Sequence, residues 1–180
     1  MPNPDLQNIF KETYDATADA IFRYCCARVS DREIARDLTQ ESFVRLWKSM
    51  QEGKDISHPK SFLFTVANHL VIDWYRKKKP FSLESLMGEE EDDDTFLADE
   101  KAYERLGVQA EGRYLLGMIG KLGAYSQIIY LRFIEDMPLS EIAKTLGISS
   151  NAASVRINRG IEKLRRLAGY DIPDDDHENT

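Results

Sequence analysis

Residues 139–166 combine two helical patterns separated by a glycine turn. Apolar residues recur at helical spacing in the first half, and Gly147 then provides a residue that tolerates a positive φ at a helix end. Ser149 or Ser150 can cap the next helix, because a serine oxygen accepts hydrogen bonds from the free amides at a helix start. The pattern predicts a helix-turn-helix whose second helix packs through Ala153, Ile157, Gly160 and Leu164.

The outer side of this second helix would carry amide, hydroxyl and guanidinium groups. A helix fits the major groove of DNA, where such groups hydrogen-bond to base edges and phosphates. The residues on this side are Asn151, Ser154, Arg156, Asn158 and Arg159. DNA binding is one interpretation of the pattern, and an ordinary helical hairpin with a solvated basic face is the other.

The net charge of −7 argues against DNA binding, but the charge is distributed unevenly along the chain. Residues 89–100 hold eight acidic residues and no basic residue, and residues 171–180 hold five more acidic residues. These two segments carry −13, which leaves +6 for the rest of the chain. Residues 80–100 also lack helical periodicity, so an acidic linker is expected between two basic folded units. The linker is either a solvated spacer or a segment that occupies a basic channel of a partner or screens the DNA-binding surfaces.

Composition limits the class of protein further. Hydrophobic residues make up 42% and charged residues 31% of the chain, as in globular domains, and no apolar run approaches membrane-spanning length. The first residues, MPNPDLQN, lack a signal-peptide core, so a cytoplasmic location is expected. Cys25 and Cys26 are adjacent and are expected to pack as thiols on a helix. With only three histidines besides, no metal site and no cofactor is expected.

Three helices are predicted before the linker. Ser30 and Glu33 form a capping box that begins the second of them. Pro59 favours the first position of the third helix, which is expected to end before Pro80. The expected ranges are residues 5–29, 31–50 and 59–79.

The second of these helices has two different sides at 100° per residue. One side is apolar and suits a core, and it holds Ala35, Phe43, Leu46, Trp47 and Met50. The other side mixes aliphatic and charged residues, namely Ile34, Asp37, Leu38, Glu41, Val44 and Arg45. A mixed side of this kind is typical of a surface that faces a partner, and the alternative is a helix buried on both sides of a small bundle.

The third helix ends with Trp74 and Tyr75, followed by the basic residues 76–79. Cations at the C-terminal end of a helix interact favourably with the helix dipole, and this interaction alone accounts for the basic residues here. Aromatic rings beside a basic cluster also suit unstacked bases and phosphates. After the linker, residues 103–122 are expected to form one or two helices weakened by glycines, and residues 125–135 a stronger one. No convincing strand pattern is present, so the chain is predicted to be all-helical.

Three motifs occur in order across the linker: DLTQESFVRLW at 37–47, PKSFLFTVANHLVIDWYRKKK at 59–79, and the segment 125–166. Together they resemble the extracytoplasmic-function branch of bacterial sigma factors, over roughly residues 5–168. The resemblance implies two helical domains. Region 2 would occupy residues 1–80 and region 4, with the helix-turn-helix, residues 109–170; the acidic linker would be residues 81–108 and the acidic tail residues 171–180.

The resemblance also assigns partners to these surfaces. Contacts with the clamp helices of core RNA polymerase would come from Asp37, Gln40, Glu41, Val44 and Arg45. Contacts with the melted minus-ten element would come from Lys60, Asn68, His69, Trp74, Tyr75, Arg76, Lys77, Lys78 and Lys79, with loop 51–58 close to a flipped base. Contacts with the minus-thirty-five element would come from Ser150, Asn151, Ser154, Arg156, Asn158 and Arg159. The linker would thread towards the RNA path of the polymerase.

This chain departs from the family pattern at three places. Asn68 and His69 stand where the family usually has Arg-Asn, which affects the upstream end of the minus-ten contact. Ser154 stands where a lysine is common, and Leu122-Gly123 where Leu-Pro is common.

The expected function is that of an alternative sigma factor, which directs core polymerase to promoters, melts the minus-ten element and performs no chemistry itself. Factors of this family are commonly held by an anti-sigma protein, often membrane-bound. Two other interpretations are a sigma-like decoy that binds an anti-sigma protein without reading promoters, and an enzyme with a helix-turn-helix regulatory domain. The sequence shows no nucleophile–base pairing and no phosphate-binding loop, which argues against the enzyme.

Overall fold

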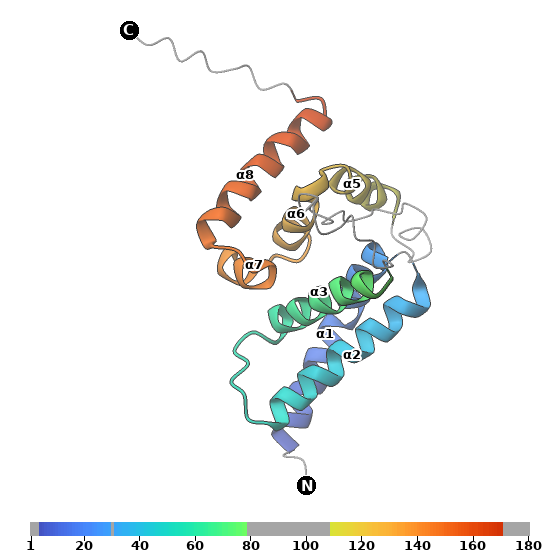
Figure 1. The fold of residues 1–180 in the computed structure, drawn as a ribbon, viewed down its shortest axis with the longest axis vertical. Helices are drawn as coiled ribbons and strands as arrows, with labels where there is room; N and C mark the ends of the chain where they lie inside the picture. Colours follow the sequence, from blue (N-terminus) through green and yellow to red (C-terminus); the bar gives the residue numbers. More distant parts are fainter. Residues whose placement is uncertain (1–3, 30, 79–108, 171–180) are drawn as a thin grey trace.

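The computed structural model describes residues 4–29, 31–78 and 109–170, and every regular element among these residues is a helix (Figure 1). Three long helices form the first unit: α1 (Pro4–Val29), α2 (Arg32–Gln51) and α3 (Pro59–Lys78). The second unit consists of α5 (Ala110–Gly120), the 3-10 turn η2 (Gly123–Tyr125), α6 (Ser126–Phe133), α7 (Leu139–Leu146) and α8 (Ser150–Leu167). The all-helical prediction is confirmed. Lys79, the predicted linker 81–108 and the predicted tail 171–180 lie outside the described residues.

In the first unit, α1 packs against both α2 and α3. Each helix contributes a fully buried large side chain to the core: Tyr24 from α1, Leu46 from α2 and Phe64 from α3. The rings of Tyr24 and Phe64 meet edge to face, with 5.3 Å between their centroids. Burying one such side chain contributes about 1.5–3 kcal/mol to folding, so this shared core fixes the relative position of the three helices.

The start of α2 differs from the sequence prediction. Asp31 is the N-cap, and its Oδ1 accepts hydrogen bonds from the backbone amides of Glu33 and Ile34. An aspartate caps as well as a serine does and adds a negative charge at the positive end of the helix dipole. The capping box predicted for Ser30 is therefore wrong, although the predicted start of the helix is correct within one residue.

The helix-turn-helix forms as the sequence predicts. Gly147 ends α7 in the left-handed conformation with φ of 66°. Of the two candidate serines, Ser149 caps α8, and its Oγ accepts a hydrogen bond from the Ala152 amide at 3.1 Å. On the predicted inner side of α8, Ala153 and Gly160 are buried, while Ile157 and Leu164 are partly buried.

The two units pack against each other through α3 and α7, and α7 in turn packs against α8 (Figure 1). Buried apolar residues of both units belong to one continuous hydrophobic cluster. The chain is therefore closed on itself, with the helix-turn-helix of the second unit lying against the last helix of the first.

Candidate nucleic-acid and partner interfaces

Helix α2 has one buried side and one exposed side. The predicted core residues Ala35, Phe43, Leu46 and Met50 are buried, and Trp47 is partly buried. The five residues predicted to contact polymerase are all exposed: Asp37, Gln40, Glu41, Val44 and Arg45. The sequence left open whether the helix is buried on both sides, and these exposures exclude that alternative.

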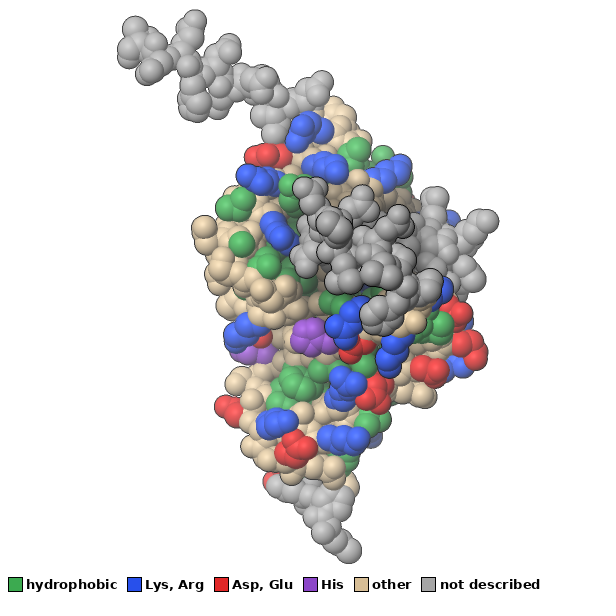
Figure 2. All heavy atoms as spheres, in the orientation of Figure 1, with side chains coloured by type: hydrophobic (Ala, Val, Ile, Leu, Met, Phe, Trp, Pro, Cys, Tyr) green, Lys and Arg blue, Asp and Glu red, His purple; other side chains and the backbone are tan. Residues whose placement is uncertain are grey.

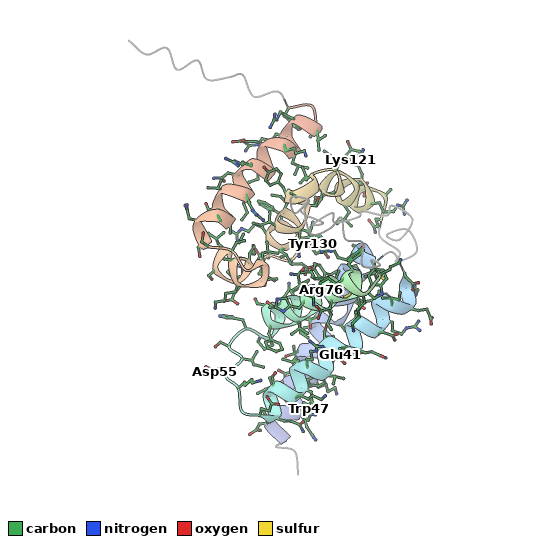
Figure 3. The ribbon with its side chains drawn as sticks, in the orientation of Figure 1. Glu41, Trp47, Asp55, Arg76, Lys121 and Tyr130 are labelled. Carbon is green, nitrogen blue, oxygen red and sulfur yellow. The ribbon has the colours of Figure 1, made fainter. Side chains whose placement is uncertain are left out.

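Two of the charged residues on this exposed side, Glu41 and Arg45, form a local ion pair. Arg45 Nε lies 2.9 Å from Glu41 Oε1, and both side chains are 46% exposed (Figure 3 labels Glu41). Exposed pairs one helical turn apart contribute only about 0.3–0.5 kcal/mol, so the pair adds little to stability. It places two opposite charges beside Val44, whose apolar side chain is 43% exposed.

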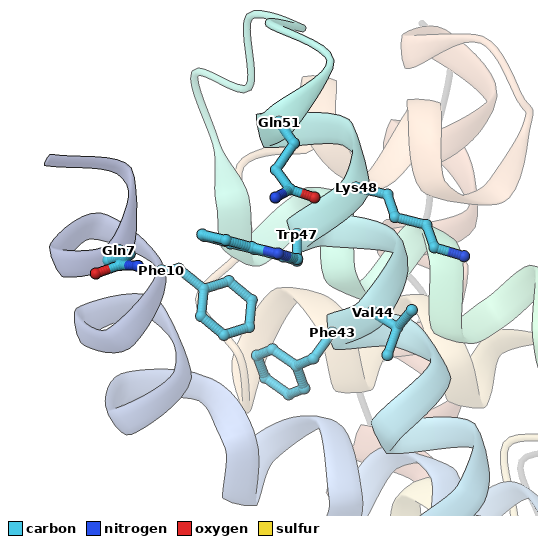
Figure 4. Close-up of a pocket in the computed structure, with 7 residues that line it drawn as sticks. All are labelled: Gln7, Phe10, Phe43, Val44, Trp47, Lys48 and Gln51. Carbon is cyan, nitrogen blue, oxygen red and sulfur yellow. The ribbon is translucent and has the colours of Figure 1, made fainter. Parts of the chain in front are cut away.

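An apolar groove runs beside this surface, between α1 and α2 (Figure 4). Phe10 and Trp47 meet edge to face at 5.1 Å between ring centroids and form its floor together with Phe43. Val44 and Lys48 belong both to the groove lining and to the exposed half of α2. The groove therefore continues the predicted polymerase-binding surface.

The aromatic residues at the end of α3 have different surroundings. The Tyr75 hydroxyl donates a hydrogen bond to the backbone carbonyl of Arg28, which ties the end of α3 to the end of α1. Trp74 packs against the Tyr75 ring at 4.8 Å, and Lys78 Nζ lies 4.8 Å from the Trp74 ring centroid. The hydroxyl of Tyr75 is thus occupied by the fold, whereas the partly exposed indole of Trp74 carries a cation on its face.

The basic residues Arg76, Lys77 and Lys78 are exposed at this end, and Arg76 forms an ion pair with Asp73 one turn earlier (Figure 3 labels Arg76). Together with Trp74 they form a partly apolar, positively charged surface. On such a surface, an aromatic ring can stack on an unpaired base and the cations can bind phosphates.

Two neighbouring residues of the predicted minus-ten contact differ in exposure. His69 is exposed, but the Asn68 side chain is only 5% exposed. Its Oδ1 accepts hydrogen bonds from the Tyr24 hydroxyl at 3.1 Å and from Gln127 Nε2 at 2.8 Å. Gln127 belongs to α6 of the second unit, so the other unit covers Asn68 in this arrangement.

Lys60, at the start of α3, is also engaged with the second unit. Its Nζ donates to the backbone carbonyl of Glu135 at 2.7 Å and lies 3.2 Å from Glu135 Oε2. The Glu135 carboxylate is 5% exposed and accepts a further hydrogen bond from the Tyr130 hydroxyl at 2.9 Å. The predicted minus-ten residues of α3 therefore differ in exposure. The end of the helix is exposed, Asn68 in its middle is buried, and Lys60 bonds to the second unit while its side chain stays 43% exposed.

The outer side of α8 is open to solvent. Asn151, Asn158 and Arg159 are exposed, Ser150 is exposed at the first position, and Ser154 and Arg156 are partly exposed. Figure 2 shows several Lys and Arg side chains over the C-terminal half of α8. Within the described residues, neither Arg156 nor Arg159 forms an ion pair.

The sequence interpretation did not anticipate the polar contacts of Gln127 and Glu135. The position of Gln127 among the core residues of YSQIIYLRFIE indicated that its side chain would be buried, and it is buried like them. A buried amide needs a hydrogen-bonding partner, which here comes from the other unit.

The two thiols pack as predicted. Cys25 and Cys26 are both buried in α1. Burial raises the pKa of the Cys25 thiol to about 12, so the thiol stays protonated at neutral pH. Among residues 4–29, 31–78 and 109–170, no cluster of side chains suits a metal ion. None of the helices described is long and apolar enough to span a membrane.

Both units match families of known proteins. Residues 13–81 match the family model described as Sigma-70 region 2, and residues 125–166 match Sigma-70, region 4. The ECF RNA polymerase sigma factor SigW of Bacillus subtilis is 30% identical over 167 residues, covering 89% of each chain. SigX of the same organism, also an ECF RNA polymerase sigma factor, is 26% identical over 164 residues, covering 89% of this chain and 84% of SigX.

A similar fold occurs in the sigma factor RpoE of Bartonella quintana, solved in complex with the anti-sigma factor NepR. The TM-score is 0.59 at 17% identity, covering 91% of this chain and 98% of that one. The chain belongs to the ECF RNA polymerase sigma factors. It is an alternative sigma factor that directs core RNA polymerase to promoters, and core polymerase and promoter DNA are its partners.

Proposed function

We propose that the exposed side of α2 is the surface that binds core polymerase. The observation that carries the proposal is the contrast within one helix, where Asp37, Gln40 and Glu41 face solvent while the opposite side fills the core. The charged side chains beside the exposed Val44 have little structural role in the free chain, because an exposed ion pair contributes little to stability. It suits a partner with complementary charges and an apolar contact.

Promoter reading is divided between two helices in this proposal. The open guanidinium groups of Arg156 and Arg159 on α8 read the minus-thirty-five element as duplex DNA. The remaining contacts of α8 are Ser150, Asn151, Ser154 and Asn158. Residues Trp74 and Arg76 to Lys79 hold the melted minus-ten strand, since a ring beside cations suits unstacked bases. Lys60, Asn68, His69 and the ring of Tyr75 complete that surface.

The domain boundaries are part of the same proposal. Region 2 at residues 1–80 and region 4 at 109–170 are supported by the two matched family regions. The acidic linker at 81–108 would follow the RNA path of polymerase, and the tail at 171–180 would add negative charge. Catalysis belongs to polymerase in this account, and the chain acts in the cytoplasm, where polymerase and promoters meet.

An anti-sigma partner is a further element of the proposal. The fold neighbour RpoE was solved in complex with the anti-sigma factor NepR. A corresponding partner of this chain, soluble or membrane-bound, would cover the polymerase-binding side of α2. The sigma-like decoy is the second candidate, and the open basic side of α8 is the observation against it, because a decoy has no use for DNA contacts.

The experiment that tests the proposal selects promoter fragments with core polymerase and this protein, with and without nucleotides. A sigma factor enriches a common sequence and releases transcripts when nucleotides are added. Polymerase binding without sequence enrichment supports the decoy, and an absence of polymerase binding contradicts both candidates.

A further inference from the structure

The apolar groove between α1 and α2 has the size of a site for a small molecule. Its volume is about 490 Å³, and sites for small ligands usually have roughly 300–1,000 Å³. Phe10, Phe43 and Trp47 form its floor, and the rings of neighbouring residues contact one another (Figure 4). An apolar group that lies on these rings is removed from water, so the floor favours a ligand with an apolar body.

The groove is polar at one end and aromatic at the other. Because α1 and α2 run in opposite directions, Gln7 near the start of α1 and Gln51 at the end of α2 line the same end. At the other end, the rings of Tyr14 and Phe43 meet at 4.8 Å between their centroids. Phe43 and Gln51 are roughly 12 Å apart along α2, at about 1.5 Å per residue. This order of residues suits an elongated molecule with a polar head and an apolar chain.

Lys48 gives the groove a positive charge. Its exposed side chain lines the groove and forms no ion pair with any described residue. The acidic residue nearest to it in the sequence is Glu52, which pairs with Lys54 at 2.8 Å instead. Figure 4 shows the Lys48 side chain leading away from the rings, and its flexible stem lets the ammonium reach a head group at the rim. Together with the side-chain amide of Gln51, this cation favours an anionic head.

We infer that this groove binds a small amphiphilic carboxylate, with its chain on the aromatic floor and its head at Lys48 and Gln51. An extended chain of about ten carbons, with C–C bonds of about 1.5 Å, spans roughly 12 Å and so matches the groove in length. The bound ligand covers Val44 and Lys48, which also belong to the exposed half of α2. It therefore competes with core polymerase for α2. This competition rests on the proposed function of α2, whereas the binding site itself does not.

The first test measures binding of decanoate to the full-length protein by calorimetry, below the concentration at which decanoate forms micelles. Lys48→Met keeps the apolar stem and removes the charge. Lys144→Met, at an exposed lysine of α7, is the matched control. Decanoate should bind wild type and Lys144→Met equally at one saturable site, and Lys48→Met about two- to fivefold more weakly, as for an exposed ion pair. The uncharged 1-decanol should not distinguish Lys48→Met from wild type. Equal affinity of all three proteins for decanoate, or an absence of binding, overturns the inference.

The second test locates the ligand by tryptophan fluorescence. Trp74→Phe leaves Trp47 as the only tryptophan of the chain. Decanoate should shift the emission of Trp47 to shorter wavelength, with the same midpoint as the calorimetric titration, because the chain displaces water from the indole. Decanoate should also bind more tightly than octanoate, by at most about fourfold for each added methylene. Unchanged emission at saturation places the ligand elsewhere and overturns the inference, as does binding to anionic lipid vesicles without binding of free decanoate.

The competition is measured by titration with labelled core polymerase. At a decanoate concentration ten times its own Kd, mutually exclusive binding should weaken the apparent affinity for polymerase about elevenfold. The same concentration should have a smaller effect on Lys48→Met. Unchanged polymerase affinity at saturating decanoate overturns the competition. Normal polymerase binding by Glu41→Lys would count against the proposed function of α2, and the calorimetric titration still decides whether the groove binds the carboxylate.

Discussion

Gly160 of α8 lies so close to Ile129 of α6 that a Cβ added at Gly160 would stand 2.7 Å from Ile129 Cγ1. The glycine is therefore required because α8 packs closely on α6. Its backbone conformation does not require a glycine, since its φ is not positive. This close approach fixes the angle at which α8 presents its outer side.

Gly160→Ala should therefore destabilise the second unit. Inserting a methyl group into such a contact costs about 1–3 kcal/mol, which outweighs the gain in helix propensity. Gly117→Ala in α5 is the matched control, because a Cβ there meets nothing within 4 Å and should be neutral or stabilising. Urea unfolding of both variants measures the difference, and equal stability would show that Ile129 moves aside at no cost.

Glu41→Lys should abolish binding of core polymerase while the protein stays folded. The change breaks the ion pair with Arg45 and places two cations on the proposed interface, where like charges cost several kcal/mol. Glu111→Lys changes net charge equally on the other unit and should bind normally. Titration with labelled core enzyme measures both variants, and normal affinity of Glu41→Lys removes this residue from the interface.

Substitutions of Trp74 and Tyr75 at the end of α3 should have different effects, one on strand opening and the other on stability. Trp74→Ala should spare the closed promoter complex and impair strand opening, since the indole is proposed to stack on an unpaired base. Tyr75→Phe should cost about 0.5–1.5 kcal/mol of stability through the lost bond to the Arg28 carbonyl, with opening retained. Permanganate footprints report opening, and a wild-type footprint for Trp74→Ala contradicts the assignment.

Arg156→Ala and Arg159→Ala should each weaken binding of polymerase to closed promoter DNA. The expected loss is about 1–3 kcal/mol for a guanidinium that is bidentate to a base, and less for a phosphate contact. Arg165→Ala, exposed in the last turn of α8, is the control within the same helix. Binding curves on the selected promoter measure the losses. Equal curves for the two variants and the Arg165→Ala control would indicate that α8 does not recognise the promoter sequence.

The buried thiol of Cys25 should make stability depend on alkaline pH. Burial raises its pKa from 9.0 to about 12, so the folded state keeps a proton that the unfolded state releases. The contribution is fully present below pH 9 and is lost as the pH rises towards 12. Urea unfolding from pH 8 to pH 11 should show a steeper fall for wild type than for Cys25→Ala. Parallel curves would show that the thiol does not contribute.

Local patterns in the sequence were sufficient for most of the fold. The two sides of α2, the glycine turn at Gly147 and the inner side of α8 follow from residue spacing alone, because helix periodicity and capping are short-range effects. The role of Asp31 in place of Ser30 was the exception, since either residue caps a helix well.

The covered state of Asn68 was not predictable in this way. Its partner Gln127 is 59 positions away, and no local pattern reports a contact over that separation. The same holds for Lys60 and Glu135, which are 75 positions apart. The sequence predicted which side chains have the chemistry for DNA, and the tertiary contacts of the closed chain decide which of them are exposed.

Promoter direction through α2 is tested most directly by mapping the transcript 5′ ends that core polymerase makes on fragmented genomic DNA, with wild-type protein and with Glu41→Lys. Discrete start sites that share two upstream elements should appear only with the wild-type protein. Start sites that are unchanged without the protein, or that persist with Glu41→Lys, would contradict the claim that this chain directs polymerase to promoters through α2.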